Sequence, residues 1–72
     1  MSAPTKLPDA WVNPDADLVG VDGNAFSILG YTTRALRRAG NPPEVVEAYK
    51  AEATTGDYDH LLAVSMTYCG MI

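Results

Sequence analysis

Three arginines, Arg34, Arg37 and Arg38, are the residues whose type and spacing best fit a chemical task in this chain. They are three of only five basic residues among 72, against nine carboxylates and a formal net charge of −4. Residues spaced i, i+3 and i+4 share one side of a helix. Guanidinium groups bind carboxylates and phosphates through paired hydrogen bonds. The spacing therefore predicts a cationic face that holds an anionic or carboxylate-bearing partner.

A simpler interpretation of this face is that the arginines are solvated and pair with carboxylates of their own chain. Exposed pairs of this kind contribute about 0–1 kcal/mol each. The available carboxylates include Glu44, Glu47, Asp15 and Asp17. The sequence leaves both interpretations open.

Other constellations point to structure rather than catalysis. The cluster Asp57, Asp59 and His60 resembles a metal site, but zinc takes three or four nitrogen or sulfur ligands, and only the distant Cys69 would join the histidine. His60 also lies about two and a half helical turns from Cys69, too far to act as its base within one helix. We therefore expect no catalytic residue, no metal and no cofactor, and a protein that is not an enzyme.

The elements that position these residues are predicted to be three helices, which makes the fold all-α. Hydrophobic periodicity and end signals place them at about residues 24–39, 42–55 and 58–69. Asp22 or Asn24 would cap the first helix, Asn41 followed by proline the second, and Asp57 the third. Gly40 and Gly56 would end the first two.

A second row of residues flanks the arginines on the first helix and contains Phe26 and Gly30. A glycine inside a helix costs about 1 kcal/mol relative to alanine, so Gly30 indicates close approach by another segment. The sequence favours the chain's own N-terminal arm as that segment; the alternative is a partner. The predicted partner-binding face comprises Phe26, Gly30, Arg34, Arg37 and Arg38.

The N-terminal arm, residues 1–17, is extended, because prolines spread through it prevent a helix. Trp11 is expected to anchor this arm by packing on the first helix, since tryptophan buries a large apolar area; the alternative is that it engages another protein. Residues 18–72 would then form a single helical domain. The third helix is apolar over more than half of its circumference, which fits either a central helix or an oligomer contact. The sequence favours a homodimer, with self-association through Val64, Met66, Tyr68, Met71 and Ile72.

The acidic charge disfavours general affinity for nucleic acid or anionic membrane. A single cysteine excludes a disulfide within the chain, and no signal peptide or membrane-spanning run is evident. We therefore expect a soluble, cytoplasmic protein.

Two stretches carry a resemblance: Asp-Gly-Asn-Ala-Phe at 22–26, which precedes the arginines, and Gly-Asp-Tyr-Asp-His-Leu-Leu at 56–62. Over about residues 18–69 the chain resembles a group of small acidic proteins of actinobacteria, their plasmids and their phages. The resemblance implies a small factor that binds and modulates a host protein, and it transfers no catalytic residue. We expect a non-catalytic protein-interaction module. The alternative is a nucleic-acid accessory protein, in which the second and third helices mimic a helix-turn-helix and the arginines contact phosphates.

Overall fold

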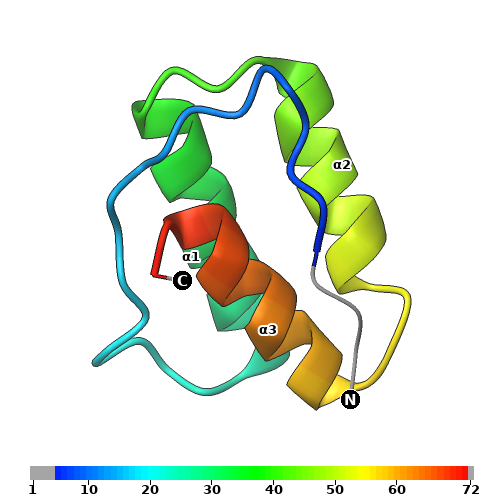
Figure 1. Ribbon diagram of the computed structural model, residues 1–72. Coiled ribbons are helices and arrows are strands. Elements are labelled where there is room, and N and C mark those ends of the chain that lie inside the picture. The colour runs from blue at the N-terminus through cyan, green and yellow to red at the C-terminus, as the bar shows by residue number, and fades with distance from the viewer. Residues whose placement is uncertain (1–4, 72) are drawn as a thin grey trace.

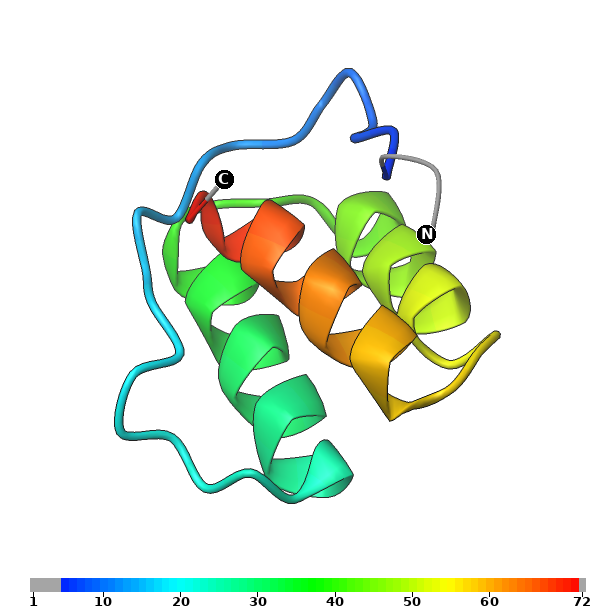
Figure 2. The ribbon, with the colours of Figure 1, turned by 60° about the horizontal axis from the view of Figure 1, so that its bottom comes forward.

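The computed structural model describes residues 5–71 and is all-α, as predicted. Its helices are α1 (Ala25–Arg38), α2 (Pro43–Ala53) and α3 (Tyr58–Cys69), each within two residues of its predicted bounds. The first two helices run in opposite directions, and α3 packs against both (Figures 1 and 2). Within the described residues, no helix has both the length and the apolar character that crossing a bilayer requires.

Two of the predicted helix caps are present. The Asn24 side chain accepts a hydrogen bond from the Phe26 N–H at 2.8 Å, while Asp22 accepts one from the Asn24 N–H at 3.0 Å. Asn24 is therefore the cap of α1, and Asp22 shapes the turn before it. Asp57 caps α3 by accepting from the His60 N–H at 2.9 Å.

The predicted cap of α2 is wrong. This helix begins at Pro43, one residue later than expected, and its first turn has no side-chain cap. An Asn41 cap would accept from the N–H two or three residues on, and Pro43 removes the first of these donors, which leaves only the Glu44 N–H. The Asn41 side chain instead bonds the arm: it accepts from the Val12 N–H at 2.7 Å and donates to the carbonyls of Val12 at 2.9 Å and Leu36 at 3.0 Å.

The hydrophobic core lies where the three helices meet. Its fully or nearly fully buried apolar side chains are Ile28, Leu36, Val45, Val46, Tyr49, Ala53, Leu61, Val64 and Tyr68. Polar groups inside it are paired: the Tyr49 and Ser65 hydroxyls lie 2.7 Å apart, and the Cys69 thiol donates to Thr32 Oγ1 at 3.7 Å. Cys69 is fully buried, as expected of a small core residue.

The arm wraps around the C-terminal ends of α3 and α1 before it descends to the start of α1 (Figure 1). Trp11 is partly buried against the core, and its Nε1–H donates to the Tyr68 carbonyl at 3.1 Å. The Ala16 N–H donates to the Cys69 carbonyl at 3.0 Å. These bonds satisfy carbonyls that the last turn of α3 leaves without an intrahelical partner. Trp11 is thus an anchor, but its hydrogen bond is to the end of α3 rather than to α1.

Candidate partner-binding groove

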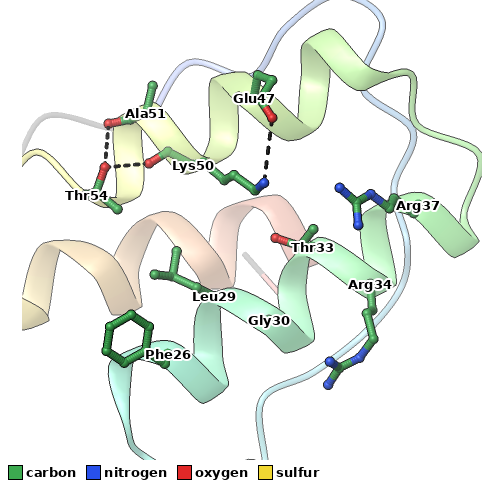
Figure 3. A pocket seen from close by; sticks show the side chains of 10 residues that line it. All are labelled: Phe26, Leu29, Gly30, Thr33, Arg34, Arg37, Glu47, Lys50, Ala51 and Thr54. Atoms are coloured by element: carbon green, nitrogen blue, oxygen red, sulfur yellow. Dashed lines mark hydrogen bonds and ion pairs between the residues drawn. The ribbon is translucent and has the colours of Figure 1, made fainter.

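An open groove with a volume of about 650 Å³ runs between α1 and α2 (Figure 3). We call it the α1–α2 groove; its lining residues are Phe26, Leu29, Gly30, Thr33, Arg34, Arg37, Glu47, Lys50, Ala51 and Thr54. Behind it, α3 crosses the pair of helices (Figure 3). The groove is therefore the side of the α1–α2 pair that α3 leaves open.

The α1 wall contains the predicted row of Phe26 and Gly30. The Phe26 ring is 84% exposed, although burying such a side chain is worth about 1.5–3 kcal/mol. Beyond Gly30 there is open space: within 4 Å, a β-carbon there would meet only Arg34 Nη1, at 3.6 Å. The expectation that Trp11 and the arm cover Gly30 is wrong, because no atom of the described arm lies within 4 Å of the position that a β-carbon would take at Gly30. The arm instead bonds Asn41 and the end of α3.

The three arginines divide between two surfaces. Arg34 and Arg37 line the α1–α2 groove, whereas Arg38 lies with Arg34 along a separate hollow beside arm residues 14–17. Figure 3 shows Arg37 reaching from α1 toward the α2 wall. All three side chains are exposed. Ion pairs over residues 5–71 are limited to Lys50 with Glu47 and His60 with Glu52, so none of the expected arginine pairs forms.

The α2 wall consists of Glu47, Lys50, Ala51 and Thr54, none of which is buried in the core. Lys50 Nζ lies 3.6 Å from Glu47 Oε2, and Lys50 reaches into the groove (Figure 3). Ala51 and Thr54 continue this wall, and the Thr54 hydroxyl donates back to the Lys50 carbonyl at 2.7 Å. The wall was missed because periodicity on one helix does not reveal which exposed stripe faces a neighbouring helix. The sequence did contain one sign of this wall: Ala51 is a small residue, as Gly30 is, and both line the groove.

The predicted self-association surface is mostly internal. Val64 and Tyr68 are 0% and 2% exposed in the core of a single chain, so they offer almost no surface to a second copy. Met66 is half-buried, Met71 is exposed, and Ile72 lies outside the described residues. The apolar circumference of α3 is explained by its contacts with α1, α2 and the arm, which is the central-helix interpretation.

The Asp57–His60 cluster contributes to the α2–α3 connection. His60 Nε2 lies 2.9 Å from Glu52 Oε2 and 3.0 Å from the Glu52 carbonyl oxygen, so the side chain ties α3 to the end of α2. In the described part of the chain, no three His, Cys, Asp or Glu side chains are grouped so that they could hold a metal ion. The cluster therefore has a structural explanation.

The groove combines an apolar part with a charged part. Leu29, Ala51 and the exposed Phe26 line the end nearer the start of α1, and Arg34, Arg37 and Glu47 line the end nearer the start of α2. Between them, the Lys50 side chain reaches toward Glu47. Comparison of the chain with protein-family models, with curated proteins and with solved structures finds no match. The groove and its chemistry therefore carry the functional argument.

Proposed function

We propose that this protein is a small non-catalytic interaction module that binds a segment of another protein in the α1–α2 groove. The observation that carries the proposal is that one groove brings together an almost fully exposed Phe26, a Gly30 that no other segment packs against closely, and two arginines that form no ion pair within residues 5–71. Aromatic residues and arginine are enriched at binding hot spots, because they bury large areas and make charge-assisted hydrogen bonds.

The resemblance of the chain to small actinobacterial, plasmid and phage proteins supplies the context for this proposal. In that context the bound protein belongs to the host, and binding modulates its activity.

The helix-turn-helix alternative has less support. The helix that would enter the major groove, α3, begins with the carboxylates of Asp57 and Asp59. Carboxylates at that position would face phosphates. The alternative predicts duplex DNA binding that is measurable at low salt and falls steeply as salt rises. A flat titration at low ionic strength would eliminate it.

The test uses a matched pair of substitutions, Ala51→Trp and Ala63→Trp. Both alanines are exposed on helices, but only Ala51 lines the α1–α2 groove. The wild-type protein and each variant are immobilised and incubated with extract of the organism that encodes the chain, and captured proteins are identified by mass spectrometry. We expect the wild type and Ala63→Trp to retain the same partner and Ala51→Trp to lose it.

Circular dichroism and thermal unfolding of both variants establish that the fold is intact. Equal capture by Ala51→Trp and Ala63→Trp would show that the partner binds elsewhere, and it would refute the proposal.

A further inference from the structure

We infer that the occupant of the α1–α2 groove is an acidic amphipathic helix, an inference that rests on the proposed function and names its partner class. A pair of packed helices has two grooves, one on each side. In this chain α3 fills one, and the other is open between helices of 14 and 11 residues. A further helix laid in the open groove would complete a four-helix arrangement, and helix-in-groove binding is a recurrent mode of peptide recognition.

The charge of the groove selects an acidic occupant. Three cationic side chains, Arg34, Arg37 and Lys50, line it with a single carboxylate, Glu47, although the whole chain has a net charge of −4. The groove is thus locally positive on an acidic protein. Glu47 contacts Lys50, which leaves both guanidinium groups to bind incoming carboxylates. Planar guanidinium groups favour paired hydrogen bonds with carboxylate oxygens.

The layout of the groove sets the register of this helix. Phe26 and Arg37 are separated by 11 positions on α1, or about 16 Å at 1.5 Å per residue. The Arg34 guanidinium lies beside Gly30, with Nη1 3.6 Å from the position that a β-carbon would take there, so it borders this part of the groove. The occupant should therefore place apolar side chains near Phe26 and Leu29, and carboxylates roughly one and a half to three helical turns further along.

The test uses a displayed library of helical peptides of about 20 residues in which one face is randomised, because shorter helices are marginal in water. Selection is carried out on the wild-type protein, with Ala51→Trp as the counter-selection bait. We expect the enriched peptides to be helical when bound, with an apolar residue followed or preceded by Asp or Glu about one and a half to three turns away.

Affinity measurements then separate the arginines. Arg37→Gln and Arg34→Gln should each weaken an enriched peptide about tenfold, as the loss of one charge-assisted contact implies. Arg38→Gln is the matched control, since it removes the same charge from an exposed site on α1 outside the groove, and it should leave the affinity unchanged. Binding should also weaken several-fold between about 0.05 and 0.5 M salt.

Several outcomes would overturn the inference. These are no enrichment over the counter-selection bait, enriched peptides without acidic residues, peptides that bind in an extended conformation, or equal effects of Arg37→Gln and Arg38→Gln. If duplex DNA displaces the peptide, the occupant of the groove is nucleic acid. If the protein forms a dimer that Ala51→Trp dissociates, the occupant is a second copy of the chain. Failure of this inference can be distinguished from failure of the proposed function. If Ala51→Trp abolishes partner capture but Arg37→Gln does not, the groove binds a protein, but it does not recognise that protein through acidic residues.

Discussion

Replacing Gly30 with alanine is expected to stabilise the protein. Gly30 lies inside α1, where glycine is less favourable than alanine because it loses more backbone freedom on folding. The added methyl group would meet one atom within 4 Å, Arg34 Nη1 at 3.6 Å, which is ordinary van der Waals contact with a flexible side chain. No steric cost therefore opposes the gain in helix propensity.

The expected gain is about 0.8–1.0 kcal/mol, the difference between glycine and alanine in a helix interior. For a domain of 60–100 residues, 1 kcal/mol corresponds to a rise of about 4–8 °C in the midpoint of thermal unfolding. A gain in stability would show that the fold does not require glycine at position 30. The open space beside Gly30 would then belong to the binding groove.

Urea titration followed by circular dichroism measures the change, with the slope of the transition checked for equality between the proteins. The reverse substitution at an exposed helical site, Ala63→Gly on α3, calibrates the scale and should cost a similar amount. If Gly30→Ala lowers the free energy of unfolding while Ala63→Gly behaves as expected, then something occupies the space beside Gly30. The groove described here would then be closed.

Three further predictions concern the core and the arm. Asn41→Ala should lower stability by about 2–4 kcal/mol and expose the arm to limited proteolysis, because three hydrogen bonds are lost; an arm that stays protected would refute the role of Asn41. Tyr49→Phe should cost about 1–3 kcal/mol by leaving the Ser65 hydroxyl unpaired, and adding Ser65→Ala should recover much of that loss, whereas simple additivity would contradict the pairing. Burial raises the pKa of the Cys69 thiol, so the folded state holds this proton more tightly than the unfolded state, and stability should fall as pH rises above about 8.5. Cys69→Ala should remove this part of the alkaline loss, and an unchanged pH profile would argue against it.

Local signals in the sequence predicted the helices well. The caps at Asn24 and Asp57 depend on neighbours within one turn, and both are present. The half of the groove on α1 followed from the same kind of signal, since Phe26 and Gly30 stand out from an otherwise regular amphipathic pattern.

Contacts between distant segments could not be predicted in this way. Asn41 bonds Val12, 29 positions away, and Trp11 bonds Tyr68, 57 positions away. The Asn-Pro-Pro sequence looks like a helix start locally, and only the path of the arm shows why the Asn41 side chain turns elsewhere. The apolar excess of α3 likewise has its explanation in the arm and two helices that cover it, which no periodicity on α3 itself specifies.

The α1–α2 groove is tested most directly by amide chemical-shift mapping of the labelled protein with an enriched helical peptide or a captured partner segment. We expect the perturbed amides to cluster along 26–37 on α1 and 47–54 on α2, with residues of the arm and the exposed side of α3 unchanged. Perturbations centred on the arm or on α3, with those two stretches unaffected, would contradict the account.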